Sequence, residues 1–245
     1  MFNLKDKKIL VMGASGYIGK QIAITLSKMG AKLVLSGKNE EALNEILLGL
    51  EGTGHFIAPF NVEDIDKTAN FIKSIVSLDK NKLFGLVYCT GIFPIRPLKN
   101  TKTDFLNNVM LINFYSFIEI VRCFSDKRIC KENASIVSLS SIAATNGDKG
   151  QLSYSASKAA MDSSIIVMAK ELSQKNIKIN SIKLAALLPD EINFDILPLA
   201  IQESINQMKT GPITNKSVSN HVAYLLSDYS GNVTGNCFNV QGYLK

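Results

Sequence analysis

The chain is predicted to fold as one α/β domain, with a doubly wound parallel sheet of about seven strands and helices on both faces. Short apolar runs rich in β-branched residues alternate with segments of helical periodicity, at roughly thirty residues per unit. Strands that alternate with helices pair in parallel, because each helix carries the chain back across one face of the sheet. No linker rich in Gly, Pro or Ser, no low-complexity tract and no repeat divides residues 1–245.

The composition is that of a globular protein and excludes several classes of function. Hydrophobic residues make up 46% of the chain and charged residues 20%, which suits a well-buried core. The net charge of +6 is mild and the basic residues are spread along the chain, so no nucleic-acid partner is expected. No run approaches the ~18 apolar residues of a membrane span, and no signal peptide opens the sequence, so we expect a cytoplasmic protein without membrane contact.

The cysteines and histidines form no metal-binding pattern. The four cysteines are Cys89, Cys123, Cys130 and Cys237. None belongs to a CxxC pair, and only His55 and His221 could join them as ligands. We therefore expect no metal, and we interpret the cysteines as reduced, buried thiols.

The first unit has the pattern of a dinucleotide-binding, Rossmann-like fold. Lys8 to Met12 is predicted to be a buried strand, a glycine-rich turn follows at once, and residues 18–29 have helical periodicity. Glycines let the backbone approach a pyrophosphate, and the helix N-terminus offers free N–H groups. The alternative is a tight turn without a ligand. The turn residues expected to contact the cofactor are Gly13, Ser15, Gly16, Tyr17, Ile18 and Gly19.

The second strand is predicted at Lys32 to Ser36. In such folds, the residues at the end of this strand contact the adenosine ribose. An acidic residue there accepts from a 2′-hydroxyl group, whereas a cation meets a 2′-phosphate. Gly37 and Lys38 stand there and no Asp or Glu does, which favours NADP(H), with NAD(H) as the second choice. The alternative is that Lys38 is a solvated loop cation. Asn39 is predicted to cap the helix from Glu40 to Leu50.

The remaining elements continue the alternation. Further strands are predicted at 55–60, 83–89, 134–139, 177–183 and 237–240, and further helices at 65–78, 103–124, 154–172 and 218–226. Residues 185–215 are predicted to form a substrate loop with a short helix inside, because prolines and a glycine interrupt any regular pattern. Ligands of such sheets bind at the carboxyl ends of the strands, where the glycine turn, Lys38, Thr90, Gly91, Ser141 and this loop all fall.

The helix at 154–172 carries a tyrosine and a lysine one turn apart. Tyr154 and Lys158 are four residues apart, so a helix places them on one face. A free tyrosine has a pKa near ~10, and a nearby ammonium group favours the phenolate and lowers that pKa. Such a pair suits a proton donor, although alone it is more often a surface contact.

Together these motifs resemble the short-chain dehydrogenase/reductase family, in its single-domain branch. Tyr154-x-x-x-Lys158 matches the family's YxxxK, and Ser141 lies thirteen positions before Tyr154, the family's usual offset for its catalytic serine. Asn113 falls in the helix where the family places a fourth catalytic residue, and the stretch from 225 to 242 resembles the family's usual ending. The resemblance implies that Asn113, Ser141, Tyr154 and Lys158 are catalytic.

The resemblance also implies a role for each residue. Tyr154 exchanges a proton with a carbonyl or alcohol oxygen, and Ser141 stabilises the charge on that oxygen. Lys158 holds the nicotinamide ribose and lowers the pKa of Tyr154, while Asn113 supports a water that leads from Lys158 to solvent. Asn61 and Val62 follow the third strand, where the family contacts adenine, with Asn61 in place of the usual Asp.

The chain departs from the family pattern at several places near the cofactor. Tyr17 stands where the common glycine motif has a glycine, and the family's NNAG reads Tyr88-Cys89-Thr90-Gly91. The Pro-Gly that usually follows the sixth strand reads Leu184-Ala185. The four catalytic positions are unchanged.

We therefore expect an NADP(H)-dependent carbonyl reductase or alcohol dehydrogenase, nearest to the 3-oxoacyl-acyl-carrier-protein reductases. The expected substrate is a small carbonyl compound or alcohol: a 3-oxoacyl thioester on an acyl carrier protein, a sugar or a secondary metabolite. A basic cluster could meet an acidic carrier, or could be a solvated helix end. Its members are Arg122, Lys127, Arg128 and Lys131. The alternative function is a dinucleotide-binding sensor or scaffold without catalysis.

The helix at 154–172 and the segment 111–121 are more apolar than one sheet face requires. We expect both to pack against their copies in another subunit, which predicts a homodimer or homotetramer.

Overall fold

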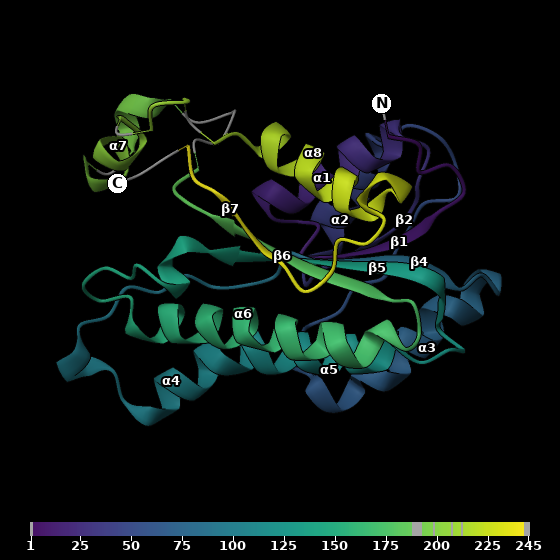
Figure 1. Cartoon of the computed structure of the whole chain (residues 1–245), viewed down its shortest axis with the longest axis horizontal. Helices are drawn as coiled ribbons and strands as arrows, with labels where there is room; N and C mark the ends of the chain where they lie inside the picture. The colour runs from purple at the N-terminus through teal and green to yellow at the C-terminus, as the bar shows by residue number, and fades with distance from the viewer. Residues whose placement is uncertain (1, 188–192, 198, 207, 212, 243–245) are drawn as a thin grey trace.

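One parallel sheet lies between two layers of helices (Figure 1). The computed structural model describes residues 2–187, 193–197, 199–206, 208–211 and 213–242. The strand order is β3-β2-β1-β4-β5-β6-β7, and all six pairings are parallel. The chain starts in the middle of the sheet, winds to one edge and then returns to build the other. This arrangement confirms the predicted doubly wound α/β fold.

The strands agree closely with the predicted ones, apart from the third and from the fifth, which begins four residues earlier and ends two residues later than predicted. The strands are β1 (Lys8–Met12), β2 (Lys32–Ser36), β3 (Phe56–Ile57), β4 (Leu83–Tyr88), β5 (Cys130–Ser141), β6 (Lys178–Leu184) and β7 (Cys237–Val240). The prediction of a strand over 55–60 is wrong in its length. β3 is an edge strand that pairs only with β2, and beyond it single bonds from Ala58 to Leu35 and from Phe60 to Gly37 continue the contact.

The helices cover both faces of the sheet. They are α1 (Tyr17–Lys28), α2 (Glu40–Leu48), α3 (Thr68–Asp79), α4 (Thr103–Met110), α5 (Ser116–Phe124), α6 (Leu152–Ser173), α7 (Leu199–Asn206) and α8 (Asn215–Leu226). In Figure 1, α1, α2 and α8 lie on one face, and α3, α5 and α6 lie on the other. Asn39 caps α2 as predicted, because its side chain accepts a hydrogen bond from the Ala42 N–H.

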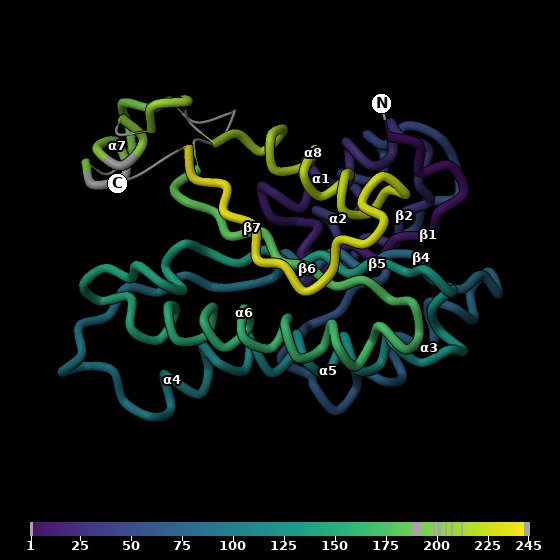
Figure 2. The backbone as a smooth tube through the Cα atoms, in the orientation of Figure 1, coloured from purple at the N-terminus to yellow at the C-terminus, as the bar shows by residue number. Residues whose placement is uncertain are grey.

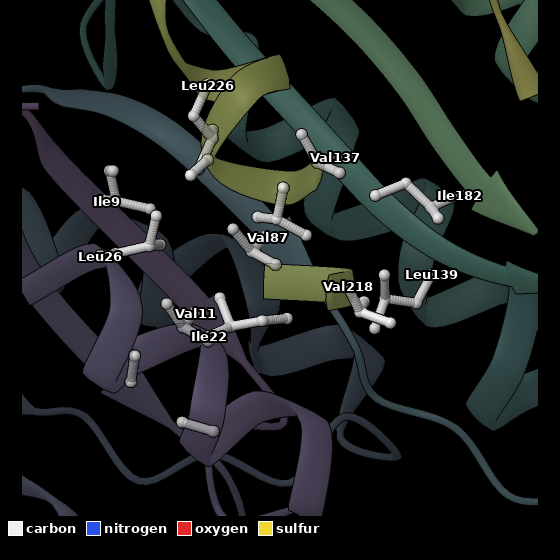
Figure 3. Packing of buried hydrophobic residues seen from close by; sticks show 14 of the residues in the cluster. Ile9, Val11, Ile22, Leu26, Val87, Val137, Leu139, Ile182, Val218 and Leu226 are labelled. Atoms are coloured by element: carbon white, nitrogen blue, oxygen red, sulfur yellow. The ribbon is translucent and has the colours of Figure 1, made fainter. Parts of the chain in front are cut away.

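The two hydrophobic cores follow from the alternation of side chains along each strand. In β1, Ile9 and Val11 face the layer of α1 and α8, whereas Leu10 and Met12 face the layer of α3, α5 and α6. Figure 3 shows the first core, where Ile9 and Val11 lie beside Ile22 and Leu26 of α1. Because both faces of the sheet are covered, β1 and β4 are continuous and largely apolar runs, and these runs predicted the strands.

The predicted helix at 103–124 contains an irregularity that the sequence did not indicate. α4 and α5 are joined by a π-helical segment, Leu111–Tyr115, which carries Asn113. The Tyr88 hydroxyl donates to the Ile112 carbonyl at 3.0 Å and meets the Ser116 hydroxyl at 2.7 Å, so the segment is bonded to the end of β4. Such π segments occur often at functional sites.

The segment at 185–215 contains a short helix, as predicted. Figure 2 shows that α7 lies beyond the carboxyl end of β7, apart from the two helical layers. Pro189, Pro198 and Pro212, on which the prediction of a loop depended, lie outside the described residues.

One side of α6 is buried, and part of its apolar surface is not. Met161 and Ile165 face the sheet, whereas Ile166 and Val167 are about half exposed, at 50% and 54%. This pattern agrees with the predicted apolar excess on α6, and the homodimer or homotetramer stays a prediction.

Candidate active site

The turn after β1 requires its glycines. Gly13 has a φ of +82°, and a Cβ there would lie 2.8 Å from the backbone nitrogen of Thr90, which follows β4. A Cβ on Gly19 would lie 2.1 Å from the carbonyl oxygen of Gly13, so this glycine lets α1 pack directly on the turn. Gly16 is the N-cap of α1 and no side chain caps the helix there. The N–H groups of its first turn are therefore left for another acceptor.

Tyr17 does not close the cavity that Tyr154 and Lys158 line at the carboxyl edge of the sheet. Its side chain is 63% exposed and lines a separate hollow of about 400 Å³ between α1 and α2, together with Lys20 and Glu45. Ile18, the next residue, lines the cavity with Tyr154 and Lys158 instead. The departure from the family's glycine motif at Tyr17 therefore leaves that cavity open.

At the end of β2, Lys38 has a partner that the sequence did not indicate. Its ammonium group lies 2.5 Å from a carboxylate oxygen of Glu63, and both side chains are partly exposed. The Glu63 N–H donates to the side-chain oxygen of Asn61 at 3.2 Å. Ser15 lies against Gly37, where a Cβ would be 2.8 Å from the serine oxygen. The side chain of Val62 is buried in the core, so only its backbone is left for a ligand.

A cavity of about 190 Å³ lies at the carboxyl edge of the sheet. Residues from the ends of β4, β5 and β6 and from the start of α6 line it. Among them are Thr90, Gly91, Ser141, Tyr154 and Lys158, which the sequence had placed in the site. A Cβ on Gly91 would lie 3.2 Å from the side-chain oxygen of Asn113, so Asn113 lies directly behind the cavity wall.

The pKa of Tyr154 is raised from its usual value, because burial disfavours the phenolate. A hydrogen bond with Ser141 acts in the opposite direction without overcoming that effect. The Lys158 ammonium group lies 5.8 Å from the centre of the tyrosine ring. The prediction that Lys158 brings the pKa of Tyr154 below its usual value is therefore wrong for this structure. The ring of Phe93 meets Tyr154 edge-on, with centres 4.6 Å apart, and no sequence pattern indicated this contact.

Lys158 is a buried lysine whose pKa is lowered toward neutral pH. Its ammonium group donates to the Leu139 carbonyl at 2.9 Å. Burial lowers the pKa of Lys158 to about 8, and the charge of Asp162 opposes that shift. The Cys89 thiol itself donates to the Met12 carbonyl, and burial raises the pKa of this thiol to about 12. Cys89 is therefore not a reactive nucleophile.

Ser141 ends β5 and is held by its neighbours on both sides. Its hydroxyl oxygen accepts from the Ala143 N–H at 3.1 Å and donates to the Leu184 carbonyl at 3.4 Å. The second bond is long, so the hydroxyl proton can be redirected to a better acceptor in the cavity.

Asn113 fixes the loop after β4 to α6. Its side-chain oxygen accepts from the Ile92 N–H at 2.8 Å, and its amide donates to the Ile92 carbonyl and to the Ser157 hydroxyl, each at 3.0 Å. The side chain is fully buried. Its amide therefore orders the cavity wall, and any contact with a water would come from its backbone.

The described residues contain no group of three or more His, Cys, Asp or Glu side chains that could hold a metal ion. In the same ranges, no helix has both the length and the apolarity needed to cross a bilayer. All four cysteines are unpaired.

The glycine turn fits a dinucleotide. The close approaches at Gly13 and Gly19 leave no room for side chains, and the uncapped start of α1 offers N–H donors to a pyrophosphate. The cavity with Tyr154 and Lys158 adjoins this turn, since Ile18, in the first turn of α1, lines it. A doubly wound sheet with such a turn and a Tyr–Ser–Lys group at its carboxyl edge defines the class of nucleotide-dependent oxidoreductases.

Comparisons with known proteins agree with this class. The family model described as short chain dehydrogenase matches residues 7–191. The chain is 30% identical over 251 residues to "Nodulation protein G" of Rhizobium meliloti (strain 1021), covering 99% of this chain and 98% of the relative. It is 28% identical over 252 residues to "3-oxoacyl-[acyl-carrier-protein] reductase FabG" of Rickettsia bellii, with 99% and 98% covered. The chain therefore belongs to the short-chain dehydrogenase/reductase family.

A solved structure with cofactor has the same architecture. This 7α-hydroxysteroid dehydrogenase, complexed with NADH and 7-oxo glycochenodeoxycholic acid, matches with a TM-score of 0.87 and 25% identity, covering 98% of this chain and 94% of that one. As a member of this family the chain is an oxidoreductase, and the family and these neighbours support carbonyl–alcohol oxidoreduction with a nicotinamide dinucleotide.

Proposed function

We propose that the protein is a reductase that prefers NADP(H) and converts a small carbonyl compound into a secondary alcohol, with Tyr154 as the proton donor. One observation carries this proposal: the hydroxyl groups of Tyr154 and Ser141 lie beside each other in a cavity that Lys158 also lines. Two neutral donors beside a buried cation suit a carbonyl oxygen that gains negative charge.

The chain's own residues would divide the work as follows. When bound, the dinucleotide supplies the hydride that the carbonyl carbon accepts. Tyr154 gives its hydroxyl proton to the carbonyl oxygen, so that an alcohol forms and a phenolate remains. Ser141 donates a second hydrogen bond to the same oxygen. Lys158 holds the cofactor ribose and stabilises the phenolate until solvent returns the proton.

The raised pKa of Tyr154 favours the reductive direction at neutral pH. Because burial keeps the phenol protonated, its proton-donating form persists well above pH 7, whereas oxidation of an alcohol needs the phenolate. Formation of the negative oxygen in the reaction, rather than the resting ammonium group, would then draw the proton from Tyr154.

A carbonyl panel tests the activity. NADPH oxidation is followed with 3-oxoacyl thioesters, ketoses and cyclic ketones, and at least one class should give turnover that saturates with substrate. Cofactor binding is measured separately by the stabilisation that NADPH gives against thermal unfolding. Stabilisation without turnover on any class would contradict the proposed activity.

The preference for NADP(H) depends on Lys38, which would have to leave Glu63 to meet a 2′-phosphate. Replacing Lys38 with Met should raise the Kd for NADPH about fivefold to tenfold, since a hydrogen bond to a charged group contributes about 1.5–3 kcal/mol and Glu63 competes for the ammonium group. The Kd for NADH should stay the same. Fluorescence titration of both nucleotides measures this.

Lys67→Met is the matched control, because Lys67 forms a similar exposed ion pair with Asp64. It should change neither Kd. Equal losses for NADPH and NADH in Lys38→Met would show that Lys38 does not distinguish the two cofactors.

An acyl group on a carrier protein is the substrate class that the FabG relatives suggest for this chain. The predicted basic cluster is partly neutralised, because Arg122 pairs with Glu119 and Arg128 with Asp126. Lysines from three segments nevertheless line a hollow of about 470 Å³ there. They are Lys82, Lys127, Lys131 and Lys175.

This hollow lies at the amino end of β5, whereas Ser141 lies at its carboxyl end. A twelve-residue strand spans roughly 35–40 Å when fully extended, so a carrier bound at the hollow would serve the active site of another subunit more readily than its own. The panel therefore includes the same 3-oxoacyl group on a carrier protein and on a small thiol. A preference for the carrier that salt abolishes would support this substrate class, and equal rates would contradict it.

A further inference from the structure

Asp162 lies one helical turn beyond Lys158 on α6 and is partly buried against β6. A carboxylate oxygen of Asp162 lies 3.5 Å from the ammonium group of Lys183, and the two side chains are only 13% and 10% exposed. The other carboxylate oxygen accepts a hydrogen bond from the Ser181 hydroxyl at 3.1 Å. The oxygen nearer to Lys183 has no hydrogen-bond partner among the described residues, so its charge is available to more than one cation.

The fold explains why these groups meet. Side chains alternate along β6, and Ser181 and Lys183 both face α6, whereas Ile182 faces the opposite core. β7 pairs with β6 so that Cys237 lies beside Ser181, and the Cys237 thiol donates to the Asp162 carbonyl at 3.6 Å. Asp162 is therefore enclosed by β6 and β7 on one side and by its own helix on the other.

The charge of this one carboxylate acts on two buried lysines, as an ion pair with Lys183 and over a longer distance on Lys158. Lys158 and Lys183 are 4% and 8% exposed, and buried lysines are rare unless they are paired. The charge of Asp162 stabilises the ammonium form of Lys158 against burial. The same charge is shared with Lys183, which lies outside the set of described residues that line the cavity.

We infer that Asp162 is a positioning residue, a counter-charge shared between Lys158 and Lys183, through which Lys183 sets the charge of Lys158 without touching the cavity. This inference rests on the proposed role of Lys158 at the ribose and beside Tyr154. It extends that role to two residues that lie outside the catalytic group.

The charged and neutral groups around Lys158 determine in which direction each variant shifts its pKa. Tyr154 and Asp162 face it from α6, Cys89 from the end of β4, and Lys183 from β6 through Asp162. β5 presents the Leu139 carbonyl, and the π segment presents the neutral Asn113. Since Cys89 and Tyr154 are protonated near neutral pH, Asp162 is the anion in this set.

The test measures the charge of Lys158 directly, without substrate or cofactor. Protein with isotope-labelled lysine side chains is titrated by NMR, and a Lys158→Met sample identifies the signal. Asp162→Asn should lower the pKa of Lys158 by about one unit or more, because the stabilising anion is gone. Lys183→Gln should raise it by about half a unit or more, because Asp162 no longer shares its charge.

If Asp162 and Lys183 had a purely structural role, their two variants would not shift the pKa of Lys158 in opposite directions. Shifts in the same direction, or no shift in Lys183→Gln, would overturn the inference. If Asp162→Asn does not fold, Lys183→Gln alone decides, since its side chain keeps a hydrogen-bond donor near Asp162. In the pH profile of kcat/KM, the alkaline limb should move to lower pH in Asp162→Asn and to higher pH in Lys183→Gln. Opposite NMR shifts without any turnover would leave this inference standing and refute the proposed function.

Discussion

Replacing Tyr154 with Phe is expected to lower kcat for carbonyl reduction by about a thousandfold, because a positioned general acid contributes roughly 10²–10⁴ in rate. The substitution removes the hydroxyl that Ser141 contacts and keeps the ring that packs against Phe93. The fold and the affinity for the cofactor should therefore stay the same. Steady-state kinetics on the best substrate of the panel, together with the NADPH Kd, measure both quantities.

Tyr229→Phe serves as the control, because Tyr229 is 75% exposed and lies in the short 3-10 turn after α8, outside the residues that line the cavity. It should match the wild type. If Tyr154→Phe kept kcat within tenfold of the wild type, Tyr154 would not be the proton donor and another group, with Ser141 as the nearest hydroxyl, would have to supply the proton.

Gly19→Ala is expected to lower the free energy of unfolding by about 3 kcal/mol or more, because forcing extra volume into a packed site costs 1–3 kcal/mol and here the obstacle is backbone. A Cβ on Gly19 would lie 2.1 Å from the Gly13 carbonyl oxygen and 2.9 Å from the Ala14 Cα. Relief would require α1 to move away from β1. Chemical denaturation of the protein without cofactor measures the loss.

Gly16→Ala provides the matched comparison within the same turn. Its Cβ would meet the Gly13 carbonyl oxygen at 3.4 Å, and its φ of −80° suits any residue. Its cost should stay within about 1 kcal/mol. Similar losses in the two variants would mean that the turn adjusts freely and that Gly19 does not fix the position of α1.

The sequence was most informative where burial on both sides left a continuous apolar run. β1 and β2 begin and end at the predicted residues. β3 does not: it has only two residues, both of them half-buried, and it pairs with β2 alone. The π segment around Asn113 was also missed, because it depends on bonds between Tyr88 and the helix backbone that no local pattern encodes.

The candidate site, too, was predictable where local sequence patterns determine it and not where distant contacts do. Spacing and family resemblance placed Ser141, Tyr154 and Lys158 around one cavity, as the structure has them. The partners that set their charges were not predictable, since Glu63 lies 25 residues from Lys38 and Lys183 pairs with Asp162 only through the packing of α6 on β6. The raised pKa of Tyr154 was missed because it depends on burial, whereas the sequence showed only the neighbouring lysine.

Transfer of deuterium is the most direct test of a catalytic Tyr154 site. NADPH that carries deuterium at the transferable position is incubated with the best carbonyl substrate, and the alcohol is analysed by mass spectrometry. A catalytic site predicts an alcohol one mass unit heavier, formed by the wild type and depressed about a thousandfold in Tyr154→Phe. Bound NADPH with no deuterium in any product would contradict it and identify the protein as a dinucleotide-binding sensor or scaffold.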